Sequence, residues 1–317
     1  MPRQTLSYLR QMFARRGIAP QHRYGQNFLI DLNIHDLIVR TAELGPEDVV
    51  LEVGSGAGAL TTRLAGQAGA VVAVEIDPAL AELTREAVAG FGNVTVLRAD
   101  VLAGKHRLDG GVVAAVRERL GAEPGRRLKL VANLPFNVAT PLITNLLVDD
   151  ELRPAMMVVT IQREVAERLV AEPGRGSYGA LTVLVQALCE VELVRVLAPS
   201  VFWPRPKVES AIVKLVTDRL RREAIADLGW FHWVVRQVFL HRRKNLRGAI
   251  AAIGGRGSQE GQGGRGWSKA EVDAVLAEQG LDGGLRAEAL NVEEWIELAE
   301  ALRRHGGGGL EGTAEAD

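Results

Sequence analysis

Short apolar segments rich in valine alternate with amphipathic segments through the first two thirds of the chain. The apolar segments cover residues 48–53, 70–75, 93–97, 128–132 and 155–161, and Gly, Pro, Asn or Asp flank them. Runs of this kind predict strands that are buried on both faces of a parallel sheet. The segment 78–89 begins with proline and places its apolar residues on one side, which predicts a helix. The alternation therefore predicts an α/β fold with a Rossmann-like, doubly wound sheet.

The pattern changes after about residue 218, where helical periodicity replaces the strand signal. Residues 225–240, 243–253, 268–278 and 292–303 are predicted to form helices. The sequence thus divides into a basic N-terminal arm (1–23), a first domain (24–217), a smaller all-helical domain (218–305) and a tail (306–317). Glycine dominates residues 254–266, which predicts a flexible loop within the helical domain, and the tail is predicted to be disordered.

The composition is that of an ordinary soluble globular protein, with 47% hydrophobic and 24% charged residues. The longest uncharged stretch, 130–148, contains two prolines and three asparagines, and we expect no membrane span. The first thirty residues lack the pattern of a secretory signal. A single cysteine, Cys189, favours a reducing compartment, and a cytoplasmic location is expected. The six histidines show no ligand spacing, so no metal site is predicted.

Positive charge is segregated along the chain although the net charge is only −1. Residues 1–30 contain five arginines and no acid, and residues 205–247 contain eleven basic residues against four acids. Residues 268–305 contain nine acids against four basic residues. Clustered positive charge favours a polyanionic partner. Arginine-rich codon usage would account for the same charge pattern.

Three of the predicted strands end in residues that suit a nucleotide. In doubly wound sheets, ligands bind beyond the carboxyl ends of the strands. The first strand runs into Gly54-Ser55-Gly56, a turn whose backbone can approach a ligand closely. The second ends at Glu75, where a carboxylate can accept from ribose hydroxyls, and Asp100 follows the third. Asp100 could accept from an adenine amine or cap the next helix. An adenosine-containing cofactor is predicted, and both NAD and S-adenosylmethionine fit.

The fourth strand ends in Asn133-Leu134-Pro135-Phe136, and this segment favours one of the two cofactors. Asn133 offers a side-chain carbonyl, Pro135 stiffens the backbone so that nearby main-chain carbonyls point outward, and Phe136 offers a flat apolar face. The amine of a nucleobase is a poor nucleophile because its lone pair is delocalised into the ring. Two acceptors that bind its N–H groups, with an aromatic ring stacked on the base, would aim the lone pair at a methyl group. Methyl transfer from S-adenosylmethionine is therefore favoured over hydride transfer.

With these residues the chain resembles the rRNA adenine N6,N6-dimethyltransferases, specifically the small-subunit dimethyladenosine transferases. The resemblance covers about residues 24–303. Besides residues 133–136, it depends on the sequences GQNFL at 25–29, QREV at 162–165, FWPRPKVES at 202–210, RRK at 242–244 and RAE at 286–288.

The resemblance implies a role for each matching residue. Asn27 and Leu29 would cover the methionine end of the cofactor, while Glu75 would bind the ribose and Asp100 the adenine. Asn133 and the Leu134 carbonyl would bind the target amine. The full set of implied cofactor-binding residues is Gln26, Asn27, Leu29, Gly54, Gly56, Glu75, Ile76, Asp100, Val101 and Asn133. The implied catalytic residues are Asn133, Leu134, Pro135 and Phe136, and the RNA-binding candidates are Arg205, Lys207, Arg242, Arg243, Lys244 and Arg247.

The family often has tyrosine where this chain has Phe136, and phenylalanine keeps the stacking face but loses the hydroxyl group. The resemblance implies dimethylation of the N6 amines of two adjacent adenosines near the 3′ end of small-subunit (16S) rRNA. The expected partner is this rRNA in an assembling ribosomal particle, and the protein is expected to be a monomer. Three alternatives stay open: a large-subunit rRNA target, a non-catalytic checkpoint in ribosome assembly, and a nicotinamide-dependent dehydrogenase.

Overall fold

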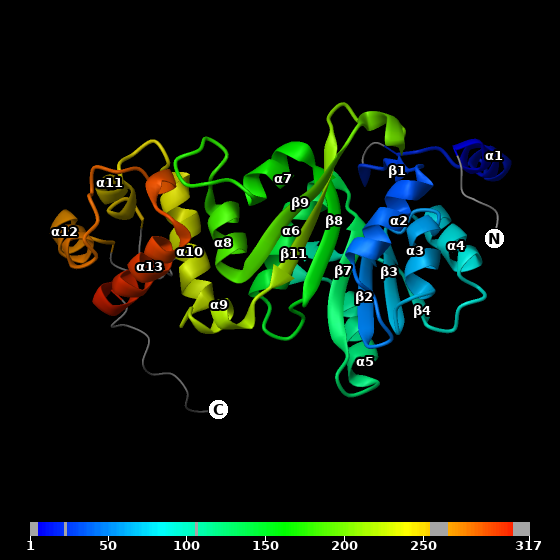
Figure 1. Ribbon diagram of the computed structural model, residues 1–317, viewed down its shortest axis with the longest axis horizontal. Coiled ribbons are helices and arrows are strands. Elements are labelled where there is room, and N and C mark those ends of the chain that lie inside the picture. The colour runs from blue at the N-terminus through cyan, green and yellow to red at the C-terminus, as the bar shows by residue number, and fades with distance from the viewer. Residues whose placement is uncertain (1–5, 22–23, 105–106, 254–265, 307–317) are drawn as a thin grey trace. The chain divides into compact units, whose positions relative to one another are not determined.

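A computed structural model describes residues 6–21, 24–104, 107–253 and 266–306, in two compact units (Figure 1). The sheet unit comprises Met1–Glu167 and Glu190–Thr217, and the helical unit comprises Arg168–Cys189 and Asp218–Asp317. The predicted glycine-rich loop, apart from Gly266, and the predicted tail, apart from Gly306, lie outside the described residues.

The sheet unit is built on seven strands in the order β4-β3-β2-β7-β8-β11-β9. The first five in this order are mutually parallel, and β11 is antiparallel to β8. The chain order reverses between β2 and β7, which is where ligands bind in such sheets. The predicted fold class is confirmed. The strand bounds are β2 (Asp48–Val53), β3 (Ala70–Glu75), β4 (Val94–Arg98), β7 (Arg127–Asn133), β8 (Met156–Gln162), β9 (Cys189–Leu197) and β11 (Ser210–Thr217).

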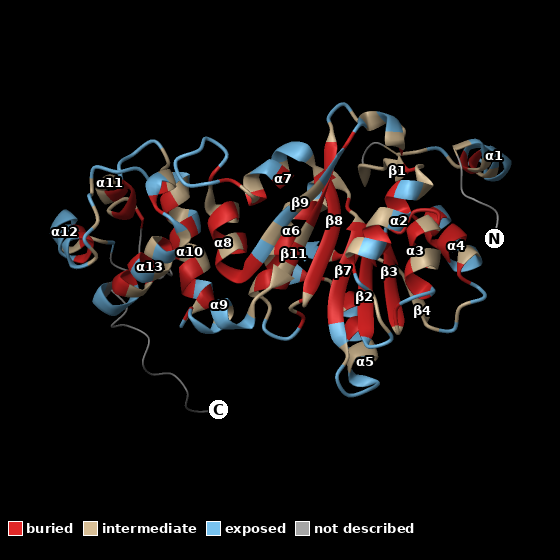
Figure 2. Ribbon diagram, in the orientation of Figure 1, coloured by how far each residue is buried: buried red, intermediate tan, exposed pale blue. Residues whose placement is uncertain are grey.

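Helices cover both faces of this sheet, and its central strands are almost wholly buried (Figure 2). Apolar residues of α2 and α3 form one core cluster with residues of the strands, including Val50 and Val71. In Figure 1 these two helices lie in front of the sheet, and α5 and α6 lie behind it. The helix bounds are α2 (Leu32–Thr41), α3 (Ala59–Ala65), α4 (Pro78–Ala87), α5 (Gly110–Gly121), α6 (Phe136–Val148) and α7 (Arg163–Leu169).

The N-terminal arm contains a helix, α1 (Leu6–Arg16), which the sequence pattern alone did not predict. Leu9 and Phe13 of α1 are buried in a cluster with apolar residues of α4. Arg16 donates two hydrogen bonds, of 2.8 and 2.5 Å, to the carboxylate of Glu86 in α4. The arm is therefore packed against the sheet unit, and part of its positive charge is neutralised there.

Short strand pairs complete the sheet unit. The strand β1 (Phe28–Leu29) follows the arm and pairs antiparallel with β10 (Phe202–Trp203). A second small pair is formed by β5 (Leu102–Gly104) and β6 (Arg107–Leu108). The pairing of β1 with β10 holds the chain that follows the arm beside the connection between β9 and β11.

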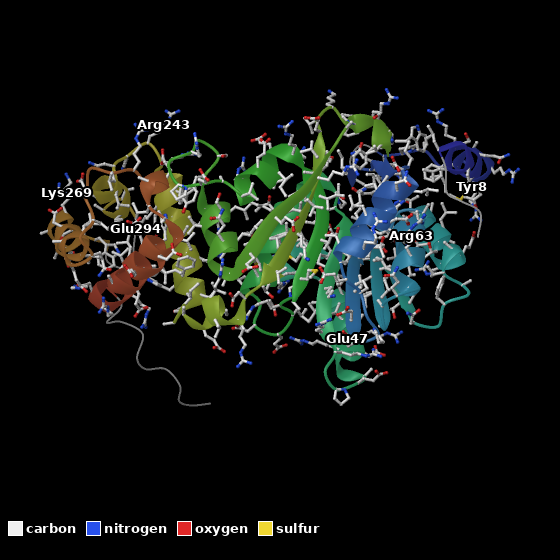
Figure 3. The ribbon with its side chains drawn as sticks, in the orientation of Figure 1. Tyr8, Glu47, Arg63, Arg243, Lys269 and Glu294 are labelled. Carbon is white, nitrogen blue, oxygen red and sulfur yellow. The ribbon has the colours of Figure 1, made fainter. Side chains whose placement is uncertain are left out.

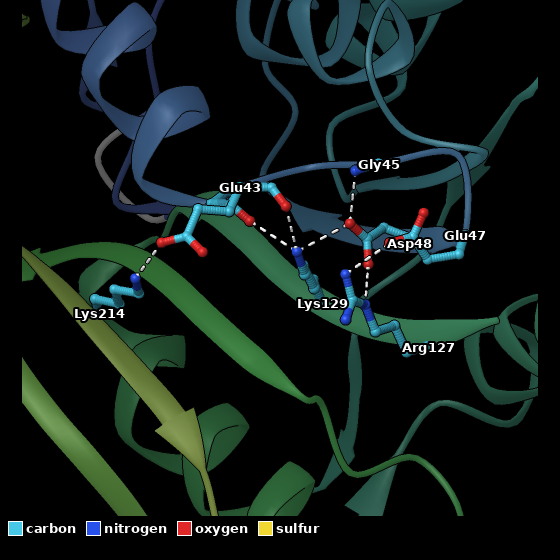
Figure 4. A network of polar contacts seen from close by, with 8 residues as sticks. Glu43, Gly45, Glu47, Asp48, Arg127, Lys129 and Lys214 are labelled. Atoms are coloured by element: carbon cyan, nitrogen blue, oxygen red, sulfur yellow. Dashed lines mark hydrogen bonds and ion pairs between the residues drawn. The ribbon is translucent and has the colours of Figure 1, made fainter. Parts of the chain in front are cut away.

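A buried ionic network joins β2 and β7 at their first residues, opposite the carboxyl ends (Figure 4). Lys129 is 3% exposed, and its ammonium group lies 2.9 Å from the carboxylate of Asp48, which is 0% exposed. The same ammonium donates to the main-chain carbonyls of Ala42 and Glu43, at 2.9 and 2.7 Å. Arg127 donates to the second oxygen of Asp48 at 2.7 Å. Both buried charges are thus paired and hydrogen-bonded, as burial requires.

The helical unit contains only helical elements among its described residues. Trp295 in α13 is fully buried, and its ring lies 5.4 Å from that of Phe239 in α10. The predicted first domain includes residues 168–189. In the structure these residues belong to the helical unit, because α8 packs on α10 and α13. The elements are α8 (Ala180–Leu188), α9 (Arg219–Glu223), α10 (Leu228–Leu240), α11 (Leu246–Ile250), α12 (Lys269–Glu278), a 3₁₀ turn (Ala287–Ala289) and α13 (Val292–Gly306). Across the part of the chain that the structure describes, no helix is long and apolar enough to cross a membrane.

Candidate active site

A pocket opens at the carboxyl ends of the parallel strands, beside the reversal in strand order. Its walls come from the ends of β2, β3, β4 and β7 and from residues 24–29, which follow the N-terminal arm. All of the predicted cofactor-binding and catalytic residues line this one pocket: Gln26, Asn27, Leu29, Gly54, Gly56, Glu75, Ile76, Asp100, Val101, Asn133, Leu134, Pro135 and Phe136.

The glycine-rich turn after β2 has a backbone that requires glycine. Gly54 and Gly56 have φ angles of +78° and +59°, where other residues are strained. A Cβ atom on Gly54 would lie 3.2 Å from the Pro135 ring, and one on Gly56 would lie 3.2 Å from the Phe28 ring. The turn therefore presents bare backbone to the pocket, which is the surface that a nucleotide cofactor needs.

Glu75 lies buried at the end of β3, with its carboxylate beside the glycine turn. Its Oε2 accepts from the Gly56 N–H at 2.9 Å and its Oε1 from the Asp77 N–H at 3.0 Å. Burial raises the pKa of Glu75, and these two hydrogen bonds act against the rise. A carboxylate has about four lone-pair positions, so the group can also accept from ribose hydroxyls.

Asp100 is exposed at the end of β4, and its Oδ1 accepts from the Leu102 N–H at 3.0 Å. The alternative role of Asp100 as a helix cap is wrong, because the chain continues into β5 rather than into a helix. Val101 beside it is buried, and Ile76 after β3 is 37% exposed. The pocket therefore has an open side near Asp100 and Ile76.

The amide of Asn133 has its orientation fixed by one hydrogen bond. Its Nδ2 donates to the main-chain carbonyl of Asn27 at 3.0 Å. A carbonyl oxygen can only accept, so the nitrogen must face Asn27 and the Oδ1 atom must face the other way. Asn133 is partly exposed and lines the pocket, so the amide is not sealed inside the protein. One acceptor is therefore available at the end of β7.

The three residues after Asn133 form a tight turn into α6. Leu134 is buried, and its N–H donates to the Thr160 carbonyl at 3.1 Å, which holds the turn against β8. Pro135 occupies the position before the first turn of α6, and the partly exposed Phe136 begins the helix. Phe136 and Asn133 both line the pocket.

Gln26 lines the pocket, but its side chain is bound to protein groups. Its Oε1 accepts from the Gln21 N–H at 2.7 Å, and its Nε2 donates to Asp77 Oδ2 at 3.4 Å. The Asn27 side chain donates to the Gly25 carbonyl at 3.1 Å. These bonds favour a structural contribution of the two side chains over a direct contact with a ligand.

The chain matches one family of known proteins over most of its length. Residues 19–282 match the sequence profile of the family described as ribosomal RNA adenine dimethylase. The chain belongs to this family. The resemblance predicted from the sequence is confirmed.

The relatives of this dimethylase-family chain include proteins named ribosomal RNA small subunit methyltransferase A. The protein from Pelotomaculum thermopropionicum is 39% identical over 300 residues, which are 94% of this chain and 97% of that protein. The protein from Lactiplantibacillus plantarum is 40% identical and covers 91% of this chain and 92% of its own length.

Two solved structures have a similar fold. A dimethyladenosine transferase from Plasmodium falciparum has a TM-score of 0.68 at 24% identity, covering 87% of this chain and 97% of that one. The 23S rRNA methyltransferase ErmE has a TM-score of 0.58 at 28% identity, covering 87% of this chain and 99% of its own.

Two buried polar residues of the pocket were not predicted from the sequence. Glu52 in β2 is 2% exposed, and its Oε2 has no hydrogen-bond partner among the described residues. Burial raises the pKa of Glu52 to about 8, and the negative charge of Glu75 adds to the rise. An acid within an apolar strand, two residues before Gly54, was a usable signal. His35 in α2 is also buried, and burial, with the Arg63 charge, lowers its pKa to about 4. No pattern in the sequence marked His35.

Two of the predicted RNA-binding residues form ion pairs within the helical unit. Arg247 donates two hydrogen bonds of 2.5 Å to Asp273 of α12. Arg242 lies 3.6 Å from the carboxylate of Glu288, which belongs to the RAE sequence. These two arginines therefore hold elements of the helical unit together.

The other predicted RNA-binding residues are exposed. Among the described residues, Arg243 and Lys244 have no ion-pair partner, and Figure 3 shows Arg243 at the surface of the helical unit. Arg205 and Lys207 are exposed in the sheet unit, after β10. Within the described parts of the chain, no group of three His, Cys, Asp or Glu side chains could hold a metal ion.

Proposed function

We propose that the protein dimethylates the N6 amines of two adjacent adenosines near the 3′ end of small-subunit rRNA, using S-adenosylmethionine. The observation that carries this proposal is the Asn133 amide, whose nitrogen is held by Asn27 so that its oxygen is left for a donor. This acceptor stands near Phe136 in the same pocket as the glycine turn and Glu75. Membership of the ribosomal RNA adenine dimethylase family supports the same function.

The pocket fits the cofactor. The turn at Gly54 and Gly56 leaves little room for a Cβ atom and presents its backbone, and Glu75 and Asp100 offer carboxylates for hydroxyl and amine groups. Glu52 adds a buried carboxyl group to the pocket wall. When bound, the cofactor supplies a methyl group on a positively charged sulfur atom.

The residues at the end of β7 would prepare the amine. Asn133 Oδ1 accepts one N6–H, and the main-chain carbonyl of Leu134 accepts the other. Two such bonds hold the nitrogen near tetrahedral geometry and aim its lone pair, which is the orientation that transfer needs. Phe136 stacks on the base, which stabilises it by about 1–3 kcal/mol. The adenosine must leave its own stack to reach this ring. The proton of the methylated amine then passes to water.

Small-subunit rRNA in an assembling particle is the proposed partner, and the protein is proposed to act on it as a monomer in the cytoplasm. The exposed Arg243, Lys244, Arg205 and Lys207 supply positive charge for phosphates. The relatives named for the small subunit favour this target over the large subunit.

The test of the proposal is Asn133→Ala with undermethylated small subunits as substrate. We expect methyl transfer to be lost while binding of S-adenosylmethionine, measured by calorimetry, is retained. Asn33→Ala, on the exposed surface of α2, is the matched control and should be fully active. Mass spectrometry of both rRNAs locates the modified adenosines. Full activity of Asn133→Ala, or dimethyladenosine only in the large-subunit rRNA, would refute the proposal.

A further inference from the structure

The segment 24–29 lies along the pocket, where its last two residues pair with β10, and it is fixed at two further places. At one of them, the Asn27 carbonyl accepts from Asn133 at the end of β7. At the other, the Gln26 side chain accepts from the Gln21 N–H at 2.7 Å and donates to Asp77 Oδ2 at 3.4 Å. Gln26 and Asn27 are adjacent, so whatever holds Gln26 also determines where the Asn27 carbonyl lies.

Asp77 connects this segment to the end of β3. Its Oδ2 accepts from the Gln21 side chain at 2.8 Å as well as from Gln26. Its Oδ1 accepts from the N–H groups of Ala79 and Leu80, which makes it the cap of α4. Its own N–H donates to Glu75. Asp77 is 3% exposed, so these hydrogen bonds are shielded from water.

We propose that Gln21, Gln26 and Asp77 form a latch that positions the target-amine acceptor Asn133. The latch holds residues 24–29 against the end of β3, and the Asn27 carbonyl then holds the Asn133 amide with its oxygen toward the substrate. None of the three latch side chains needs to touch the substrate. They are positioning residues, and this inference rests on the proposed function of Asn133.

The latch acts on methyl transfer through the geometry of Asn133. The Asn133 side chain has one hydrogen bond that distinguishes its two amide orientations, and the acceptor of that bond is a main-chain carbonyl. If residues 24–29 shift, the amide can rotate and present its Nδ2, a donor, to an amine that needs an acceptor. A misplacement of about 1 Å at a reacting centre reduces the rate about 100-fold. The Glu75 carboxylate and the glycine turn keep their own bond to each other.

The first test uses Gln26→Met, which keeps the length of the side chain and removes its hydrogen bonds. We expect kcat for methylation of undermethylated small subunits to fall about 10- to 100-fold, with the Kd for S-adenosylmethionine changed by less than about threefold. Gln67→Met, an exposed glutamine of the same unit, is the matched control and should leave both quantities unchanged.

The second test exchanges donor and acceptor across the latch. Gln26→Glu alone places two carboxylates together, and Asp77→Asn alone places amide donors together while an asparagine still caps α4. In the double variant, Gln26→Glu with Asp77→Asn, the new carboxylate at position 26 accepts from the new amide at position 77, and the Gln21 amide can turn to accept as well. We expect each single variant to lose kcat and the double variant to recover to within about threefold of the wild type, a coupling that a double-mutant cycle measures.

The outcomes distinguish failure of the latch from failure of the proposed function. Recovery in the double variant supports the latch when the single variants keep their affinity for the cofactor, because unchanged cofactor affinity shows that the single variants are folded. Wild-type kcat in Gln26→Met, additive losses without recovery, or loss of cofactor affinity equal to the loss of kcat would overturn it. Those results leave the proposed function intact as long as Asn133→Ala is inactive. Activity of Asn133→Ala refutes the proposed function itself.

Discussion

Replacing Lys129 by methionine measures how strongly the buried network at the start of β2 and β7 stabilises the sheet unit. Methionine has nearly the volume of the lysine stem, so little packing is lost. The substitution removes the ammonium group that lies 2.9, 2.9 and 2.7 Å from its partners at Asp48, Ala42 and Glu43. Asp48 is fully buried, so water cannot replace the lost donor. Arg127 and the Gly45 N–H still bind the Asp48 carboxylate, each at 2.7 Å, so its charge stays partly compensated. Leaving a buried acceptor without its donor costs about 1–3 kcal/mol, and we expect the unfolding free energy to fall by that amount.

The loss of unfolding free energy in Lys129→Met should become smaller as the pH falls. Burial alone raises the pKa of Asp48, but hydrogen bonds from Arg127 and Lys129 outweigh it and hold the pKa below its usual value. A carboxyl with a depressed pKa stabilises the fold above its unfolded-state pKa of about 3.9, and this contribution disappears as the pH falls through the folded-state pKa. Without Lys129 the pKa of Asp48 rises, so the variant protonates Asp48 at a higher pH. The difference in unfolding free energy between Lys129→Met and the wild type is therefore largest at pH 7 and becomes smaller toward pH 4.

Lys214→Met is the matched control, because Lys214 belongs to the same network but pairs with an exposed group (Figure 4). Its Nζ lies 2.5 Å from Glu43, whose side chain is 62% exposed, and exposed pairs contribute about 0–1 kcal/mol. Hydrogen exchange of peptides from β2 and β7 across a urea series measures the stability of this unit separately from the helical unit. The reasoning is refuted if Lys129→Met loses no more stability than Lys214→Met, or if its loss is the same at pH 7 and pH 4.

Three further predictions concern the pocket and the RNA surface. Phe136→Ala should lower kcat/KM on undermethylated small subunits about 5- to 150-fold, the equivalent of 1–3 kcal/mol of stacking, whereas Phe136→Tyr should stay near the wild type. Replacing both Arg243 and Lys244 by glutamine should weaken binding to the particle. A plot of log affinity against log salt concentration should become less steep, by about one unit of slope for each phosphate that is no longer neutralised. An unchanged slope in binding titrations argues against an RNA-binding role for the two residues. Burial raises the pKa of Glu52 to about 8, so the wild type should lose stability as the pH rises from about 4.5 to about 8. In thermal melts, the stability of Glu52→Gln should depend less on pH over this range. Parallel pH profiles for the variant and the wild type would contradict the raised pKa of Glu52.

The strands that form the pocket could be predicted because each gives a local signal. The two predicted strands at 48–53 and 70–75 coincide with β2 and β3, where every residue is buried. A strand buried on both faces has no polar alternation, so its limits are set by the flanking turns alone. The glycine turn, Glu75 and Asn133 follow or end such strands, and the sequence therefore places them at one edge of the sheet.

Two strands of the seven-stranded sheet, β9 and β11, and the helix α1 were not predicted. The strand β9 is mostly not buried, and the alternation of apolar and charged residues at 189–193 changes phase at Val194, which shortens the signal. The strand β11 carries a short apolar run interrupted by Lys214, and it follows a proline-containing segment and pairs with β8, about fifty residues earlier in the chain. In helix α1 the arginines dominate the sequence, and only Leu9 and Phe13, four residues apart, have the spacing of a buried helical face.

The sequence predicted which residues line the pocket but not which atom of each residue faces it. The sequence around Asn133 does not determine how its side-chain amide is oriented. That orientation is set by a hydrogen bond to Asn27, which lies 106 residues earlier in the chain. Gln26 was assigned to the cofactor because it belongs to the GQNFL sequence, yet its hydrogen bonds go to Gln21 and Asp77. Side-chain orientation is determined by partners brought together by folding, and one sequence carries no record of those partners.

Close packing around Pro135 extends this argument to positions that have no side chain. A Cβ atom on Gly25 would lie 3.8 Å from Pro135, and one on Gly54 would lie 3.2 Å from it, so two backbone segments enclose the same ring. The proline in turn fixes the direction of the chain between Asn133 and Phe136. The proposed amine-binding residues at the end of β7 are therefore held on two sides by backbone, and the Asn27 carbonyl holds the Asn133 side chain. Rigid support of this kind keeps the two acceptors and the aromatic ring in place before the substrate arrives, which is the condition under which such a site accelerates transfer.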